Sequence, residues 1–343
     1  MRRGKLVTTL LCTAMALGML TGCGKESDST TTEATTEVTT EAATEEATVL
    51  DAATDEDADD ENYDTGDATL DNVRNQDEIG DNELLVVSFG TSYNDSRRLT
   101  IGAIEDKLDD KFGDTYSVRR GFTSQIIIDH VKSRDDIAID NVKEALDRAV
   151  DNGVKNLVVQ PTHLMNGLEY NELVDEIANY SDAFDSVSIG EPLLTSDDDF
   201  DKVITAITDA TAEYDDGETA ICFMGHGTEA DSNAVYAKMQ ELLTEKGYDN
   251  YYVGTVEATP SLDDVLALVK AGDYKRVVLR PLMVVAGDHA NNDMAGDEDD
   301  SWKSAFEDAG YEVICVVNGL GELPAIQDIF VEHAQAAIDA ANK

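Results

Sequence analysis

AICFMGHGT, residues 220–228, is a short apolar run that ends in a Gly-His-Gly turn. VVSFGT, residues 86–91, follows the same pattern, and each run precedes an amphipathic stretch, at 232–243 and 100–108 respectively. A continuous apolar run of this length is typical of a parallel strand that is buried on both faces. The repeated pattern therefore predicts an α/β fold in which buried strands alternate with helices.

A second repeat divides the chain into two similar halves. Residues 158–167 read VVQPTHLMNG, and residues 278–287 read VLRPLMVVAG. We expect an N-terminal lobe at 83–215 and a C-terminal lobe at 216–343, each a Rossmann-like parallel sheet flanked by helices, with a cleft between them. Ligands of open α/β sheets bind at the carboxyl ends of the strands, so functional residues are expected where the apolar runs end.

The N-terminus, residues 1–23, has the features of a secretory signal. Three basic residues among the first five precede an apolar run at residues 6–20, which is too short for a comfortable membrane span. LTGC at residues 20–23 resembles the bacterial lipobox, whose cysteine is lipidated after cleavage; an ordinary signal peptide with a chance cysteine is the alternative. The expected mature protein begins at Cys23 and is held by its lipid at the outer face of the cytoplasmic membrane.

The segment at residues 24–82 is rich in Thr, Glu, Asp and Ala, and Lys25 and Arg74 are its only basic residues. Low hydrophobicity with high net charge predicts a disordered, extended tether. The formal net charge of the whole chain is −47, and the remainder is also acidic, so duplex nucleic acid is a poor partner. Cys222 and Cys315 lie in apolar runs and are expected to be buried free thiols.

Three residues with metal-binding side chains follow apolar runs of the second half. His226 lies in the Gly-His-Gly turn, Glu257 follows residues 251–256, and His289 lies beyond residues 278–285 in a polar loop. Each has an ordinary alternative: a turn histidine, an acid that favours a helix N-terminus, and a solvated loop histidine. Two nitrogens and one oxygen suit Co²⁺, Fe²⁺, Ni²⁺ or Zn²⁺, and three protein ligands leave a coordination position open. Together the three residues predict one divalent-metal site.

Several longer motifs resemble those of one enzyme family. They are LVVSFGTSY (85–93), VQPTH (159–163), MGHGT (224–228), GTVE (254–257), LMVVAGDHANNDMAGD (282–297) and SWK (301–303). On these motifs the chain beyond residue 82 resembles the anaerobic-type sirohydrochlorin cobaltochelatases. They are class II chelatase-like lyases that insert Co²⁺ into a tetrapyrrole for cobalamin biosynthesis. The resemblance implies that His226, Glu257 and His289 are the metal ligands.

The residue types fit metallation chemistry. A histidine with a pKa near neutrality can hold a divalent ion and accept a proton, so His226 is expected to act catalytically together with Glu257. The residues expected to contact the substrate are Ser88, Thr91, His163 and Arg280. For His163, a hydrogen-bonded structural histidine is the alternative.

The remaining charged residues are expected to have simpler roles. The candidates to meet the carboxylates of the substrate are Arg97, Arg98, Arg119, Arg120 and Arg280, with a solvated surface position as the alternative for each. His130 and His333 are expected on solvated helix surfaces. The acidic loop at 293–300 is expected to be a solvated face that draws cations toward the cleft.

Export favours a second class of protein, because tetrapyrrole assembly is normally cytoplasmic. The alternative to a chelatase is an exported lipoprotein that captures haem, another tetrapyrrole or a metal ion. In both readings a lipid anchor is the only expected membrane contact, and homo-oligomerisation is compatible with both.

Overall fold

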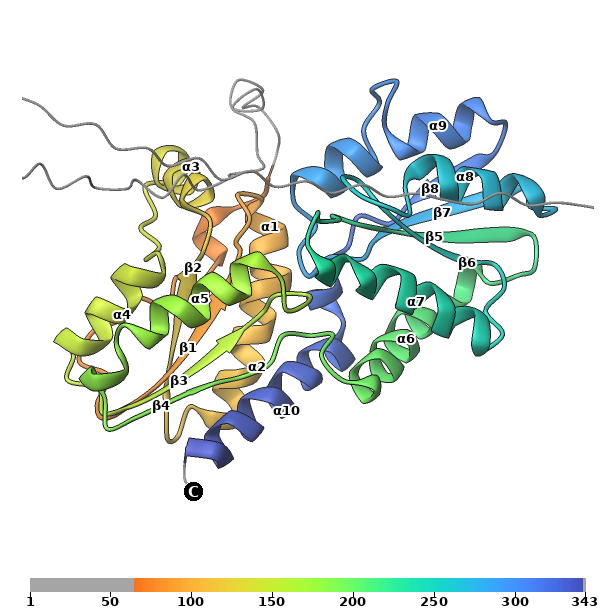
Figure 1. The fold of residues 1–343 in the computed structure, drawn as a ribbon. Helices are drawn as coiled ribbons and strands as arrows, with labels where there is room; N and C mark the ends of the chain where they lie inside the picture. Colours follow the sequence, from red (N-terminus) through yellow and green to blue (C-terminus); the bar gives the residue numbers. More distant parts are fainter. Residues whose placement is uncertain (1–64, 342–343) are drawn as a thin grey trace, which may run out of the picture. The chain divides into compact units, whose positions relative to one another are not determined.

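The computed structural model describes residues 65–341, which fold around two four-stranded parallel sheets (Figure 1). The predicted signal at residues 1–23, with Cys23, lies outside the described residues. The N-terminal sheet has the strand order β2-β1-β3-β4, and the C-terminal sheet has the order β6-β5-β7-β8. The strands are β1 (Asn82–Ser88), β2 (Ser117–Phe122), β3 (Asn156–Pro161), β4 (Ser186–Ile189), β5 (Thr219–Gly225), β6 (Tyr251–Thr255), β7 (Arg276–Pro281) and β8 (Glu312–Cys315).

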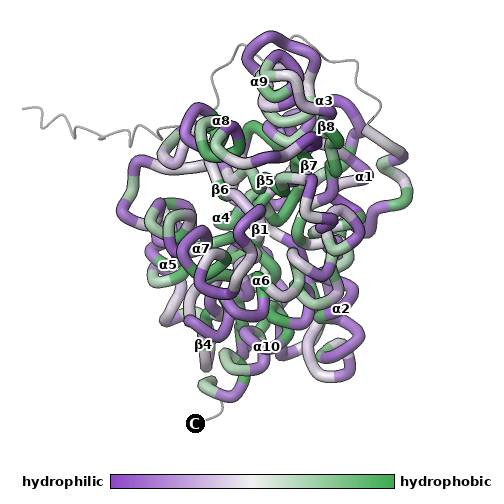
Figure 2. The backbone as a smooth tube through the Cα atoms, turned by 90° about the vertical axis from the view of Figure 1, so that its right-hand side faces the viewer, coloured by the Kyte–Doolittle hydropathy of each residue, from purple (hydrophilic) through white to green (hydrophobic). Residues whose placement is uncertain are grey.

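The two sheets repeat one topology. In each, the first strand is central and pairs in parallel with the second and third strands of its lobe. Strand β5 is buried along its whole length: Ile221 and Phe223 enter one core cluster, while Cys222 and Met224 enter another on the opposite face. Figure 2 shows hydrophobic residues concentrated along these strands. The predicted α/β fold with two similar lobes is confirmed.

Helices cover both sheets, and many of them begin at a polar cap. Asn141, Ser196 and Ser261 each form a capping box with an acid three residues later, so the helices after them start at defined positions. Between residues 65 and 341, no helix is both long and apolar enough to cross a membrane. The α-helices are α1 (Asn94–Arg97), α2 (Ala103–Phe112), α3 (Gln125–Asp135), α4 (Val142–Asp151), α5 (Leu168–Ala178), α6 (Asp197–Thr211), α7 (Ala234–Glu245), α8 (Leu262–Ala271), α9 (Trp302–Asp308) and α10 (Pro324–Ala341).

Short turns of other helix types connect these elements. Two are π-helices, a rare form that often occurs at functional sites. The π-helices are η3 (Arg98–Gly102) and η7 (Ala290–Met294), and the 3₁₀ helices are η2 (Ala68–Leu70), η4 (Ser181–Ala183), η5 (Ala212–Tyr214), η6 (Asp231–Asn233) and η8 (Leu320–Glu322).

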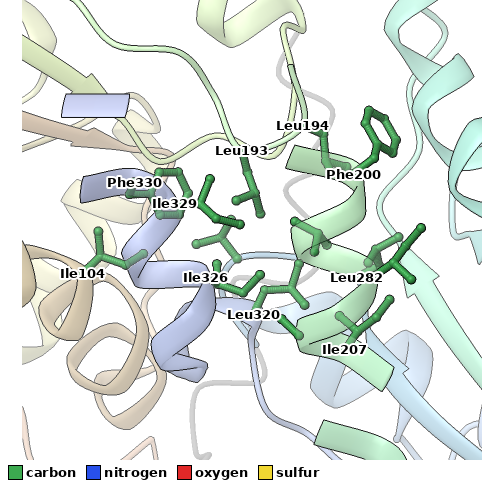
Figure 3. Close-up of a cluster of buried hydrophobic side chains, with 14 of the residues drawn as sticks. Ile104, Leu193, Leu194, Phe200, Ile207, Leu282, Leu320, Ile326, Ile329 and Phe330 are labelled. Atoms are coloured by element: carbon green, nitrogen blue, oxygen red, sulfur yellow. The ribbon is translucent and has the colours of Figure 1, made fainter. Parts of the chain in front are cut away.

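The C-terminal helix returns to the N-terminal lobe. Helix α10 contacts α2, β3 and β4 there, as well as α6. Figure 3 shows the core that this return creates: Ile104 of α2, Phe200 of α6 and Phe330 of α10 lie in one apolar cluster with Leu282, which follows β7. The predicted division near residue 215 therefore separates the two sheets, but it assigns α10 to the wrong lobe.

The chain before β1 is part of the N-terminal lobe from residue 65 onward. Arg74 is only 6% exposed, and it forms ion pairs with Asp106 (2.6 Å) and Asp109 (3.1 Å). Asp71 pairs with two arginines of the lobe. The prediction of a disordered tether is therefore wrong for residues 65–81, because ion pairs hold this polar segment together with the packing of Val73 and Ile79 against the core.

Three of the arginines predicted to meet substrate carboxylates are instead fully buried in ion pairs. Arg120 contacts Glu105 at 2.7 Å and Asp71 at 2.6 Å. Arg97 also contacts Asp71, at 2.8 Å. Arg119 contacts Glu83 at 3.1 Å, and burial raises the pKa of Glu83 to about 7 although Arg119 opposes this. These side chains hold the lobe together and are not free to bind a substrate, so the prediction is wrong for all three.

Removing one arginine from this network should destabilise the protein. Arg120→Ala leaves the buried Glu105 carboxylate without its main partner, so we expect the free energy of unfolding to fall by about 3–5 kcal/mol. Chemical denaturation measures this. The control is Lys132→Ala, which removes an exposed ion pair with Asp136 and should cost less than about 1 kcal/mol. Equal stability of the two variants would show that the buried network is not a major source of stability.

Candidate metal centre

The structure brings His226, Glu257 and His289 together. One ligand atom from each lies within 4.8 Å of those of the other two. The His226 Nδ1 atom is 3.7 Å from Glu257 Oε2, and the centroids of the two imidazole rings are 4.6 Å apart. No other such group of three occurs among residues 65–341. The spacing between the three atoms is suitable for one shared ion.

Backbone pairing positions the first two of these residues. His226 directly follows β5 and Glu257 leaves β6, and the backbone N–H of Glu257 donates to the carbonyl of His226 at 2.9 Å. Gly227 has a positive φ of 92°, and a Cβ there would lie 2.8 Å from the nitrogen of Ala258. A Cβ on Gly225 would lie 2.1 Å from the Tyr236 ring. The Gly-His-Gly sequence is therefore required because both neighbours of His226 approach other groups too closely for a side chain.

Hydrogen bonds orient both imidazole rings. The Nδ1 atom of His226 is 2.7 Å from the carbonyl oxygen of Gly227, and the Nδ1 atom of His289 is 2.7 Å from Asp293 Oδ2. A proton on each Nδ1 satisfies these contacts and leaves the lone pair of Nε2 for an ion. The π-helix η7, which follows His289 directly, brings the Asp293 carboxylate to the ring.

The charge around the site is negative. Burial alone would lower the pKa of His289, but the hydrogen bond from its ring to Asp293 and the charges of Asp293, Glu257 and Asp288 outweigh burial and raise that pKa. The side chains of His226, Glu257 and His289 are 40%, 35% and 34% exposed. The centre therefore attracts cations and remains open to solvent on one side, which leaves room for a further ligand.

Ser88 and Thr91, two of the residues predicted to contact the substrate, form hydrogen bonds within the protein. Ser88 is 2% exposed and accepts a hydrogen bond of 2.7 Å from the Thr162 hydroxyl. Thr91 is also 2% exposed, and its hydroxyl accepts from the backbone of Tyr93. Both hydroxyls are therefore bonded at the strand-end turns of the N-terminal lobe, and the substrate contact stays a prediction for both residues.

The other predicted contacts, His163 and Arg280, are buried as well. His163 follows β3, and neither of its buried ring nitrogens has a hydrogen-bond partner, so the alternative of a hydrogen-bonded structural histidine is wrong, and the substrate contact stays a prediction. Burial lowers its pKa to about 4 and keeps the ring neutral. Arg280 is 4% exposed in β7, beside Phe223 of β5, and the Glu322 carboxylate partly offsets its charge.

Two further expectations about polar residues need correction. His333 is not a solvated surface histidine: its Nε2 atom is 3.0 Å from Asp199, and its Nδ1 atom is 3.0 Å from the carbonyl of Glu191. Asp293 belongs to the metal centre and not only to a solvated acidic loop. The sequence signal for this role is the spacing of four residues between His289 and Asp293, which places two side chains on one face of a helical turn.

Removing the charge of Asp293 should weaken metal binding. Asp293→Asn keeps the size of the side chain but removes the carboxylate that orients His289, so we expect affinity for Co²⁺ to fall by roughly 10- to 100-fold. Titration of the purified protein with Co²⁺ measures this. Asp299→Asn is the matched control, because it removes an exposed charge from the same loop. Equal losses in both variants would mean that Asp293 acts only through overall charge.

Replacing His163 should change how stability depends on pH. The pKa of His163 is about 4 in the folded protein and about 6.5 when unfolded, so the unfolded chain gains a proton first as the pH falls. This histidine therefore removes stability as the pH falls from about 6.5 to about 4. We expect the melting temperature of His163→Leu to rise increasingly above that of the wild type as the pH falls from about 7 to about 4.5. His130→Leu, on helix α3, is the control, and parallel melting curves for wild type and His163→Leu would refute the prediction.

Comparisons with known proteins identify the family of this chain. The sequence pattern of the cobalt chelatase (CbiK) family matches residues 82–339. The sirohydrochlorin cobaltochelatase of Salmonella typhimurium is 38% identical over 258 residues, which are 75% of this chain and 97% of that protein. The sirohydrochlorin cobaltochelatase CbiKC of Nitratidesulfovibrio vulgaris is 32% identical over 187 residues, covering 54% of this chain and 66% of that protein.

A solved structure shares the fold at low sequence identity. SirB from Bacillus subtilis with Fe³⁺ has a TM-score of 0.53 and 13% identity, and the match covers 77% of this chain and 98% of that one. The family pattern spans both sheets and reaches from β1 into α10. This chain therefore belongs to the cobalt chelatase family.

Proposed function

We propose that this protein is a sirohydrochlorin cobaltochelatase, a lyase-class metal chelatase that inserts Co²⁺ into the tetrapyrrole ring. The observation that carries the proposal is the cluster of His226, Glu257 and His289, whose ligand atoms lie within 4.8 Å of one another in a chain of this family. Two imidazoles and one carboxylate bind a divalent ion firmly, yet they leave coordination positions through which a pyrrole nitrogen can approach.

The reaction exchanges two protons for one ion. Two pyrrolic N–H protons must leave the ring as Co²⁺ enters it, so the ion has to pass from protein ligands to ring nitrogens while bases accept the protons. The Glu257 carboxylate is 35% exposed beside His226, and it is placed both to offset the charge of the ion and to accept a proton. His226 is the second candidate base, because its ring accepts a proton once the ion has left.

Most of the arginines predicted to meet the carboxylates of sirohydrochlorin are buried. Of the five arginines predicted for this role, Arg98 is the one that stays partly exposed, at 35%, where it contacts Asp95 at 3.2 Å. Because this pair lies at the surface, Arg98 can exchange Asp95 for a substrate carboxylate at little cost. The proposal therefore assigns Arg98 a substrate contact and removes Arg97, Arg119 and Arg120 from that role.

The proposed location is outside the cytoplasmic membrane, held there by a lipid on Cys23. The basic and apolar N-terminal run and the lipobox-like LTGC sequence support it. This location also favours one alternative function, the capture of haem, another tetrapyrrole or a metal ion by an exported lipoprotein. The same ligand set also suits Fe²⁺, Ni²⁺ and Zn²⁺, which belong with Co²⁺ in any test.

The two functions are distinguished by turnover. Purified protein is mixed with sirohydrochlorin and Co²⁺, and the absorbance change that accompanies metallation is followed against a protein-free control. We expect repeated turnovers faster than the uncatalysed reaction. A protein that binds haem tightly but does not accelerate metallation with any of the four ions would contradict the chelatase proposal and favour capture.

One substitution tests the chemical role of Glu257. Glu257→Gln keeps a ligand oxygen but removes the negative charge and the proton acceptor, so we expect turnover at saturating Co²⁺ to fall by about 100-fold. Glu298→Gln, in the exposed acidic loop, is the control and should retain wild-type turnover. Unchanged turnover in Glu257→Gln would assign proton removal to another group.

A further inference from the structure

The N-terminal lobe contributes none of the three clustered ligands, but it touches the loop that carries one of them. The backbone N–H of Ala286 donates a 2.9 Å hydrogen bond to the hydroxyl of Ser96, which lies in α1 of the other lobe. Ala286 precedes His289 by three residues and is 3% exposed. Its N–H group has no ready access to water, so loss of the Ser96 hydroxyl would leave a buried donor unsatisfied.

The neighbours of Ala286 also face the N-terminal lobe. Val285 packs against an apolar cluster that includes Ile101 and Phe122 of that lobe. A Cβ on Gly287 would lie 3.1 Å from Thr91 Oγ1, so the backbone passes close to the turn after β1. Three consecutive residues of this loop are therefore in contact with the lobe that holds no ligand.

The beginning of the same loop is held by the segment at η8. The backbone N–H groups of Leu320 and Gly321 donate to the carbonyls of Met283 (2.8 Å) and Val284 (2.9 Å). A Cβ on Gly319 would lie 2.5 Å from the Val284 carbonyl oxygen. Because both η8 and Ser96 hold the loop, it has little freedom to relax when either contact is removed.

A short chain of hydrogen bonds then leads from the contact to the ligand. The Asn291 side chain donates to the carbonyl of Gly287 at 2.7 Å, and its backbone N–H donates to the same oxygen at 3.2 Å. His289 lies between these two residues and starts the π-helix that supplies Asp293. A displacement of residues 286 and 287 would therefore move the His289 ring.

We propose that Ser96 is a positioning residue, through which the N-terminal lobe sets the place of His289 in the metal centre. This inference rests on the proposed function, because it takes His289 to be a ligand of the inserted ion. It gives the ligand-free lobe a direct part in metal binding. A tetrapyrrole that shifts α1 would also change the affinity of the centre for the ion. By linkage, the bound ion would change the affinity for that tetrapyrrole by the same factor.

The test uses the purified protein and Co²⁺ alone, without a tetrapyrrole. We expect Ser96→Ala to weaken Co²⁺ binding by about tenfold and to alter the visible absorption band of the bound ion. Ser96→Thr keeps the hydroxyl and should restore both. Ser92→Ala removes a hydroxyl from the same segment and is the matched control. Wild-type affinity and spectrum in Ser96→Ala would overturn the proposal.

A double-substitution cycle separates positioning from general destabilisation. If Ser96 acts through His289, Ser96→Ala should change Co²⁺ affinity little in a His289→Ala background. If Ser96→Ala lowers Co²⁺ affinity equally in the wild type and in His289→Ala, the proposal is overturned. This outcome would also reveal a Ser96→Ala variant that binds Co²⁺ weakly only because it folds poorly. A different result would show that the proposed metal centre is wrong. In that case His226→Ala and His289→Ala would each bind Co²⁺ as tightly as the wild type.

Discussion

The candidate metal centre depends on the parallel pairing of β5 with β6 on one side and with β7 on the other. This pairing aligns Gly225 with Thr255 and Met224 with Pro281, so three chain segments leave the sheet at one edge. His226, Glu257 and His289 follow these strand ends, although 63 residues separate the first from the last. The pairing is stable because β5 is buried on both faces, and side chains on its solvent-facing end are therefore held on a rigid base.

The two lobes share this topology but have separate tasks. In the N-terminal lobe the turn after the central strand carries Phe89, Gly90 and Thr91 in place of Gly-His-Gly, and Gly90 packs on the Phe122 ring. The N-terminal lobe buries ion pairs in its interior, where Arg97, Arg119 and Arg120 are paired with buried carboxylates. In the other lobe, Glu257 and the two imidazoles lie partly exposed at the strand ends, where they can hold an ion. The shared core around α10 and the contact of Ser96 with Ala286 join the two.

Sequence reasoning predicted the parts that follow from local pattern. Apolar runs located the central strands, and strand-end logic located His226, Glu257 and His289. It failed where long-range contacts decide the outcome. Arg74 and Asp71 lie in a segment with the composition of a disordered chain, yet ion pairs with the lobe hold them. Arg119 and Arg120 of β2 were predicted to meet the substrate, or else to be solvated, because no local pattern reveals a buried partner. Likewise, nothing in the amphipathic sequence of α10 indicates which sheet it covers.

The central claim is that one ion is held by the two imidazoles and the one carboxylate. A structure of the protein with bound Co²⁺, with the anomalous signal recorded at the cobalt absorption edge, tests it most directly. The account predicts a single strong peak about 2.0–2.2 Å from one nitrogen each of His226 and His289 and from an oxygen of Glu257. A peak in the acidic loop at residues 297–300, with none between the two imidazoles, would contradict it.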